Sequence, residues 1–126
     1  MVRILLVGLG GGLGAISRYL VGELVARRWS GLSFPVATMS VNILGCLLLG
    51  ILVGLVEASD RISAETRVFL FIGLLGGFTT FSSFGAETFS LLTDGRTALA
   101  VLNVIVQVVV GVLAVWAGVV LARACV

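Results

Sequence analysis

Long stretches without a charged residue dominate the pattern of apolar and polar positions along the chain. Three of them cover residues 29–56, 68–86 and 97–122. Each is long enough to cross a bilayer as a helix, which takes about 20 apolar residues. An earlier stretch, 4–26, has the same length but contains Arg18 and Glu23. The pattern therefore predicts four membrane-spanning helices, over approximately residues 3–27, 34–56, 66–92 and 96–124.

The segments between these runs are short and polar. Residues 27–35 begin with two arginines and end in the only proline, Pro35, a residue that is tolerated in the first turn of a helix. Residues 57–67 form a charged loop, and residues 93–96 form a tight polar turn. A cleaved signal peptide is the alternative for the first run. Because nothing soluble follows it, we interpret that run as a retained span.

Composition supports a membrane protein and excludes a soluble domain. The chain is 60% hydrophobic and 11% charged, whereas soluble domains have about 45–50% apolar and about 25% charged residues. Four spans would use about 80 of the 126 residues. We therefore expect a single all-α membrane domain over residues 1–126.

The charged and sulfur-containing residues argue against an enzyme and against nucleic-acid binding. All eight basic residues are arginines spread along the chain, and histidine, the commonest general base, is absent. Cys46 and Cys125 are far apart and form no metal-binding motif. With four spans, one side would carry four arginines and the other three. This weak bias allows insertion in both orientations, and it is equally compatible with a single orientation that cannot be predicted.

Small residues recur four positions apart in three of the predicted helices. The pairs are Gly8 and Gly12, Gly10 and Gly14, Gly50 and Gly54, and Gly73 and Gly77. Such spacing allows the backbones of two helices to approach closely in a membrane. We therefore predict a compact bundle with several tight helix contacts.

The third predicted helix has an unusual centre. Two glycines precede Phe78, Thr79 and Thr80, and glycine and β-branched residues are poor helix formers. A break there would free backbone carbonyls, which can coordinate a cation such as Na⁺. Taken alone, these residues slightly favour the alternative, a continuous helix with glycine at a crossing point.

Beyond this centre, uncharged donors gather. Phe81 and Phe84 are three residues apart and share a helix face, and aromatic rings have positive edges. With the hydroxyls of Ser82 and Ser83 and the amide of Asn42, they could line a path for a small anion. The alternative for the two phenylalanines is ordinary packing, which is the commoner role of such a pair.

Three segments resemble the Fluc (CrcB) family of fluoride channels. They are residues 11–19 (GGLGAISRY), 41–45 (VNILG) and 76–84 (GGFTTFSSF) followed by Glu87. The resemblance implies an antiparallel, dual-topology homodimer whose third helix is broken near its middle. It also implies two fluoride pores and a central structural Na⁺, with fluoride exported passively across a prokaryotic inner membrane.

The resemblance also assigns roles to individual residues. It implies that the backbone carbonyls of Gly76 and Thr79 hold Na⁺, and that Arg18 sets a positive potential near the vestibules. It places in the pore Asn42, Phe81, Phe84, Ser82 and Ser83. It leaves open the roles of Glu87 and of Asn103 and Gln107 in the fourth helix, which has no Ser or Thr after Ala98.

Two other classes of protein are less compatible with these residues. A small proton-coupled multidrug transporter would need an embedded acid in the first helix, where this chain has Arg18, with Glu23 near the helix end. A scaffold subunit without transport activity would not need polar residues within its spans, since these are costly there.

Overall fold

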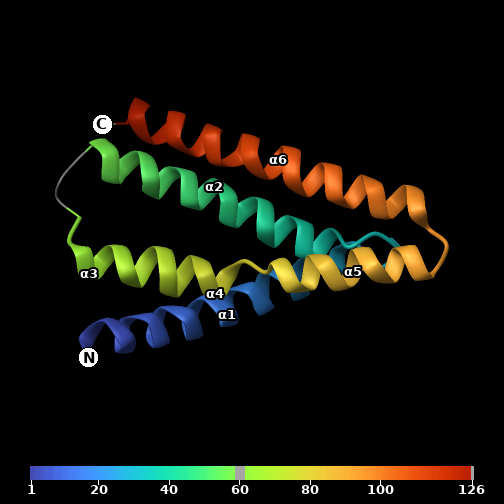
Figure 1. Ribbon diagram of the computed structural model, residues 1–126, viewed down its shortest axis with the longest axis horizontal. Helices are drawn as coiled ribbons and strands as arrows, with labels where there is room; N and C mark the ends of the chain where they lie inside the picture. The colour runs from blue at the N-terminus through green and yellow to red at the C-terminus, as the bar shows by residue number, and fades with distance from the viewer. Residues whose placement is uncertain (59–61, 126) are drawn as a thin grey trace.

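The computed structural model describes residues 1–58 and 62–125, and this part of the chain is helical without any strand (Figure 1). In chain order the elements are α1 (Val2–Arg28), α2 (Val36–Ala58), α3 (Ala64–Arg67), the π-helix η1 (Val68–Leu75), α4 (Gly76–Phe78), α5 (Phe81–Thr93) and α6 (Thr97–Ala124). Four helical stretches are long and apolar enough to cross a membrane: α1, α2, the run from α3 to α5, and α6. The chain is thus an all-helical membrane protein with four spans, as predicted.

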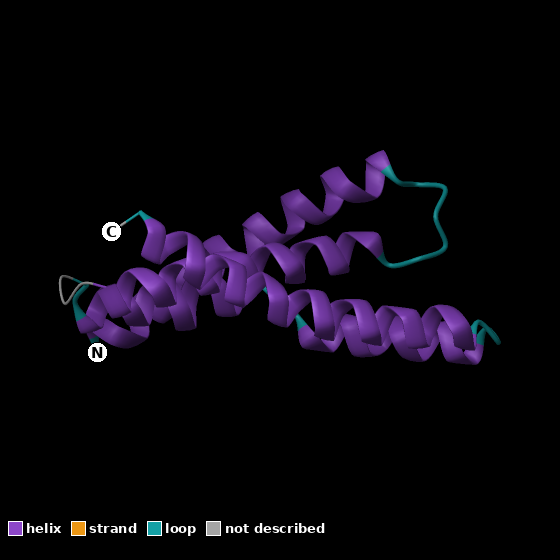
Figure 2. Ribbon diagram, turned by 90° about the horizontal axis from the view of Figure 1, so that it is seen from above, coloured by secondary structure: helices purple, strands orange, loops and turns teal. Residues whose placement is uncertain are grey.

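The spans form two closely packed pairs. α2 packs along α6, and α1 packs along η1 and α4 (Figure 1). Both termini lie at one end of the molecule. At the other end the chain separates into two arms, one made of α1 and the start of α2, the other of α5 and the start of α6 (Figure 2).

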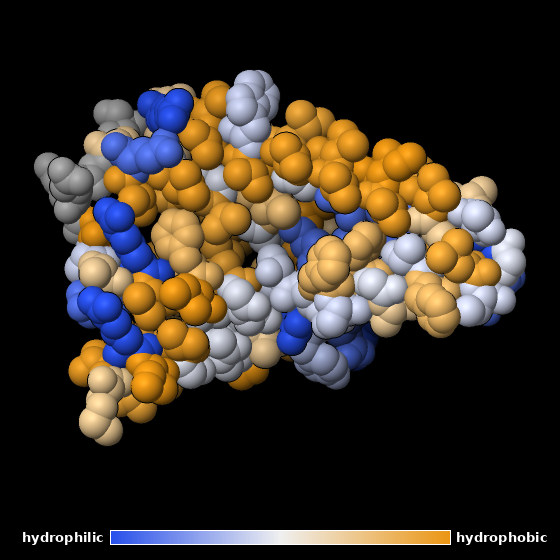
Figure 3. Space-filling model, viewed as in Figure 1, coloured by the Kyte–Doolittle hydropathy of each residue, from blue (hydrophilic) through white to orange (hydrophobic). Residues whose placement is uncertain are grey.

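Many large apolar side chains are exposed on the outside of the molecule. Only a few are buried, among them Val41, Leu75 and Phe78. Apolar side chains cover the visible face along α6, and hydrophilic ones gather at the end that holds the termini (Figure 3). A bilayer provides the apolar surroundings that the interior provides in a soluble protein, so such a surface is stable in lipid.

Glycines form the contacts between the paired helices. A Cβ atom at Gly10 would lie 2.7 Å from the carbonyl oxygen of Phe69, and one at Gly77 would lie 2.5 Å from that of Gly11. Gly50 and Gly118 likewise leave no room for a Cβ against the partner backbone between α2 and α6. The predicted tight contacts are confirmed at Gly10, Gly50 and Gly77, and Gly118 adds one that the spacing did not predict.

The contacts between the paired helices, α1 with η1 and α4 and α2 with α6, are called the seams below. The glycines of the predicted pair Gly8 and Gly12 differ from those at the seams. A Cβ atom at either position would meet nothing within 4 Å. This face of α1 is therefore open in the single chain.

Six of the described arginines lie near the two ends of the molecule. Arg3 near the start of α1, Arg67 at the end of α3 and Arg123 near the end of α6 fall on helix ends that lie with the termini (Figure 1). Arg27 and Arg28 at the end of α1 and Arg96 just before α6 fall on helix ends at the opposite side. Arg61, which was counted with the first group, lies outside the described residues. With Arg61 counted from the sequence, the bias remains a weak one of four arginines against three. Exposed ion pairs at the two ends include Arg123 with Glu57 at 2.7 Å and Arg27 with Glu23 at 2.9 Å.

Two local features differ from the expectation. The second helix begins at Val36 rather than residue 34, because the Pro35 carbonyl accepts the first helical hydrogen bond, from the Met39 N–H, at 3.1 Å. The third span begins with a short α-helix and continues as a π-helix over Val68–Leu75. π-Helical turns are rare and often occur near functional sites, and nothing in the apolar run predicted one.

Candidate functional site

Two residues in the middle of the third span are not helical. Thr79 has φ −84° and ψ 160°, and Thr80 has φ −150° and ψ 111°, so both are extended. Helical residues 64–78 precede them and residues 81–93 follow. The Thr80 hydroxyl accepts a hydrogen bond from the Ser83 N–H at 3.2 Å and so caps the start of α5. A threonine at this position is a favoured N-cap.

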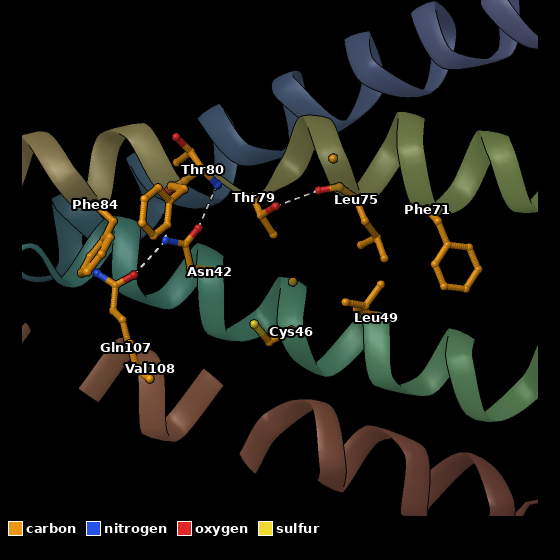
Figure 4. Close-up of a pocket in the computed structure, with 13 residues that line it drawn as sticks. Asn42, Cys46, Leu49, Phe71, Leu75, Thr79, Thr80, Phe84, Gln107 and Val108 are labelled. Atoms are coloured by element: carbon orange, nitrogen blue, oxygen red, sulfur yellow. Dashed lines mark hydrogen bonds between the residues drawn. The ribbon is translucent and has the colours of Figure 1, made fainter. Parts of the chain in front are cut away.

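Asn42 of α2 binds both the N–H and the carbonyl group of Thr80 in this extended segment. Its Oδ1 accepts the Thr80 N–H at 2.9 Å, and its Nδ2 donates to the Thr80 carbonyl at 3.2 Å (Figure 4). In a continuous helix the Thr80 N–H would instead donate to the carbonyl of Gly76. The Asn42 side chain thus satisfies a backbone group at membrane depth and leaves the Gly76 carbonyl without its helical donor.

Gly45, one turn further along α2, makes room for the same segment. A Cβ at this position would overlap the Thr79 methyl group. The Thr79 hydroxyl turns back and donates to the Leu75 carbonyl at 3.1 Å. Asn42 and Gly45 on one face of α2 therefore hold the two extended threonines.

The carbonyls at this segment are the groups that could hold a cation. Among the described residues, no group of three or more histidine, cysteine or acidic side chains gathers in a way that could bind a metal. Backbone carbonyls freed where a membrane helix is interrupted are known ligands of Na⁺. The freed carbonyl of Gly76 therefore fits a monovalent cation held by oxygen atoms of the backbone.

A pocket of about 360 Å³ lies beside the extended segment, between α2 and the third span, and α6 contributes Gln107 and Val108 to its lining (Figure 4). Five of the eight residues to which the resemblance assigns a role line it: Asn42, Gly76, Thr79, Phe81 and Phe84. Residues that the sequence did not single out also line it, among them Leu49, Phe71 and Cys46. The residues that line it carry no formal charge.

The two phenylalanines form an aromatic pair at the edge of this pocket. Their ring centroids are 5.4 Å apart and the ring planes meet at 54°. This tilted arrangement points ring edges, which are positive, in different directions. Phe81 is 83% exposed in the single chain, so packing inside this chain does not account for its position.

Ser82 and Ser83 do not line the pocket, although they adjoin it. Their hydroxyls lie 3.2 Å and 3.0 Å from the Thr80 hydroxyl. The structure thus groups three hydroxyls at the start of α5, and of these three residues only Thr80 lines the pocket.

Arg18 lies apart from these residues, on α1. It is partly exposed, and among the described residues no carboxylate lies within 4.0 Å of its guanidinium group. An arginine at this position adds positive potential to this part of the membrane span.

Helix α6 takes part in the site through two amides whose role the sequence left open. Asn42 Nδ2 donates to Gln107 Oε1 at 2.8 Å, and Gln107 Nε2 donates to Asn103 Oδ1 at 2.9 Å. Asn103 is fully buried and donates to the Thr88 hydroxyl at 2.9 Å. Polar residues 103 and 107, four apart in an apolar helix, were the signal for this contact.

Glu87 has a partner that the sequence did not indicate. Its Oε1 accepts a hydrogen bond from the Thr38 hydroxyl at 2.5 Å, and its Oε2 is buried with no partner among the described residues. Thr38 lies one turn before Asn42 on α2. The contact therefore extends the polar face of α2 toward one end of the third span.

Together the four spans, the interrupted third helix and the uncharged pocket define a small multi-pass integral membrane protein. A family model described as CrcB-like protein, Camphor Resistance (CrcB), matches residues 5–119. The chain belongs to this family, which confirms the resemblance found in its motifs.

Several relatives match almost the whole chain. The fluoride-specific ion channel FluC of Agrobacterium fabrum is 45% identical over 98% of both chains. That of Rhizobium meliloti is 44% identical over the full length of both. That of Methylobacillus flagellatus is 44% identical over 94% of this chain and 92% of the relative. These relatives are ion channels by name, in agreement with the expectation that the chain is not an enzyme.

Proposed function

We propose that this chain forms a fluoride-selective channel that exports fluoride passively across the cytoplasmic membrane of a prokaryote. The observation that carries the proposal is the pocket beside the interrupted helix. It combines the amide of Asn42 with the aromatic pair Phe81 and Phe84, and no charged side chain lines it. The names of the relatives support fluoride as the ion.

The chemistry of these residues suits a small, strongly hydrated anion. Amide N–H groups, hydroxyls and ring edges can replace the water around fluoride when they lie close to it. A larger halide would meet the same donors at less favourable distances. The hydroxyls of Ser82 and Ser83 would extend the path beyond the pocket, and Arg18 would raise the potential for anions near its mouth.

The channel we propose is an antiparallel homodimer with two pores. Three features support a second copy of the chain: the exposed ring of Phe81, the open face at Gly8 and Gly12, and the weak bias of four arginines against three between the two sides. Such a weak bias gives a chain little electrostatic reason to prefer one orientation. Labelling from outside the cell of a single cysteine placed at Ser30, in a chain lacking Cys46 and Cys125, should reach only part of the population.

The homodimer would hold a structural Na⁺ at its centre. The carbonyls of Gly76 and Thr79 would provide oxygen ligands from each chain, and the ion would keep the two interrupted helices together. It would not move with the transported anion. The freed carbonyl of Gly76 supports this role.

Fluoride efflux from proteoliposomes tests the proposed function. Liposomes would be loaded with potassium fluoride or potassium chloride. A potassium ionophore would let K⁺ leave together with the anion, and an ion-selective electrode would measure the released anion. We expect rapid release of fluoride and no matching release of chloride. Folded protein that releases neither anion, or both equally, would overturn the proposal.

A further inference from the structure

One continuous series of hydrogen bonds leads from the extended segment to the carbonyl of Phe84. A backbone N–H can only donate, so the bond from Thr80 fixes Oδ1 of Asn42 toward Thr80 and Nδ2 toward Gln107. Gln107 must then accept through Oε1 and donate through Nε2 to Asn103. The direction of each amide in the series follows from this one backbone group.

The far end of the series is also anchored to backbone. Asn103 donates to the Thr88 hydroxyl, and Thr88 donates to the Phe84 carbonyl at 2.7 Å. Hydrogen bonds that all run in one sense polarise one another and hold their members in place. Gln107 is therefore held with its Oε1 toward Asn42, within the lining of the pocket.

Asn42 has no free hydrogen atom in this arrangement. One N–H of its amide donates to the Thr80 carbonyl at 3.2 Å and the other to Gln107 Oε1 at 2.8 Å. An anion in the pocket could bind this amide only by replacing one of the two acceptors. The Thr80 bonds orient the side chain from both sides, so the acceptor that can be exchanged is Gln107.

We propose that Gln107 Oε1 is a built-in competitor for the anion at Asn42, which makes Gln107 a specificity-determining positioning residue. The inference rests on the proposed function. An anionic acceptor forms a stronger hydrogen bond than a neutral amide oxygen, so a compact fluoride ion displaces Gln107. A large anion with diffuse charge gains less from the exchange and leaves the Asn42–Gln107 bond closed.

Replacing Gln107 by methionine tests this competition. Methionine has a similar length and shape but offers Asn42 no comparable acceptor, while Thr80 still orients the Asn42 amide. We expect the fluoride concentration for half-maximal efflux to fall about two- to tenfold, which corresponds to one net hydrogen bond. We also expect the preference for fluoride over chloride to decrease.

Thr88 provides a matched pair of controls at the far end of the series. Thr88→Val removes the hydroxyl that anchors Asn103 and should shift the half-maximal concentration in the same direction by a smaller factor. Thr88→Ser keeps the hydroxyl and should behave as the unsubstituted chain. If Thr88→Val has no effect, the anchoring of Gln107 through Asn103 is wrong.

The outcomes separate this inference from the proposed function. A purely structural role for Gln107 predicts less folded protein but an unchanged half-maximal concentration and selectivity, and that result would overturn the inference alone. If the methionine variant does not assemble, Gln107→Asn takes its place. Its amide oxygen lies one methylene further from Asn42, and it must show the same fall in the half-maximal fluoride concentration. If the unsubstituted chain does not release fluoride, both proposals fail together.

Discussion

The seams between paired helices and the centre of the third span are held together in different ways. Along the seams, glycines let backbones touch, as Gly50 and Gly118 do between α2 and α6. At the centre, Thr79 and Thr80 leave the helix, and an amide side chain replaces the missing backbone hydrogen bonds. Both regions lie in the apolar part of the chain.

The difference shows how a membrane protein can keep an irregular backbone within lipid. Where small residues pack closely, the helices gain van der Waals contact. This contact depends on the shape of the two helices and needs no particular polar partner. An extended segment exposes N–H and C=O groups, each of which costs several kcal/mol in hydrocarbon when unsatisfied. The centre therefore needs specific polar partners, and Asn42 is the residue that supplies them.

The largest effect is expected from removing an aromatic ring at the centre. Phe84→Ile takes a ring edge from the pocket without changing the packing along the seams. If the ring lines the pore, fluoride efflux should fall at least about a hundredfold, or about 2.7 kcal/mol in barrier height. Efflux per folded protein measures this, with Phe89→Ile on the same helix but outside the pocket as control. Undiminished efflux in the folded Phe84 variant would remove that residue from the pore.

A substitution in a seam should change the free energy of unfolding rather than the selectivity for fluoride. Gly118→Ala places a Cβ against the backbone of Leu47 and Ile51, which cannot move aside, and should cost about 2–3 kcal/mol. Gly111→Ala is the matched control on the same helix, because its Cβ would lie at an ordinary 3.5 Å from the Cys46 sulfur. Unfolding in a denaturing detergent series measures both. Equal losses in the two variants would show that close backbone contact is not what stabilises this seam.

The extended segment should depend on a single acceptor atom. Asn42→Leu leaves the Thr80 N–H without its partner, at a cost of about 1–3 kcal/mol, and hydrogen exchange at that amide should become faster. Asn42→Asp loses the donor to the Thr80 carbonyl and to Gln107 but keeps an acceptor for the Thr80 N–H, so it should preserve the slow exchange at that amide. Slow exchange in the leucine variant would mean that another group satisfies Thr80.

The smallest effect is expected at the ends of the helices. Arg123 and Glu57 form an ion pair at 2.7 Å, but both side chains are at least half exposed. Glu57→Gln should change stability by less than about 1 kcal/mol, because water screens such pairs. Thermal unfolding at low and high salt checks this. A larger loss of stability would mean that the pair lies in a less polar environment than the exposure of its side chains indicates.

Much of the fold follows from local pattern. Three of the four spans were visible as charge-free runs and the first as an apolar stretch with two charges, and the four-residue spacing of Gly10 and Gly14 marked a tight helix contact, which the structure places against η1. The same spacing at Gly8 and Gly12 has no partner within the chain. Spacing alone does not tell which of two glycine faces meets another helix of the same chain.

The site could be predicted only in part. Asn42, Phe81 and Phe84 were singled out as polar or aromatic residues of the spans, and the structure gathers them at one pocket. The contacts of Asn42 with Thr80 and Gln107, and of Thr38 with Glu87, join residues 38 to 65 positions apart. Local periodicity carries no information on such distant pairs.

By itself the sequence determined that this chain enters a membrane, where its helices lie and which family it belongs to. These properties depend on apolar content and on motifs that can be read residue by residue. Only the tertiary structure decided how the backbone is satisfied at Thr79 and Thr80 and which way each amide points. The physical reason is that a hydrogen bond depends on direction and distance between groups, and packing of α2 and α6 around the third span sets both.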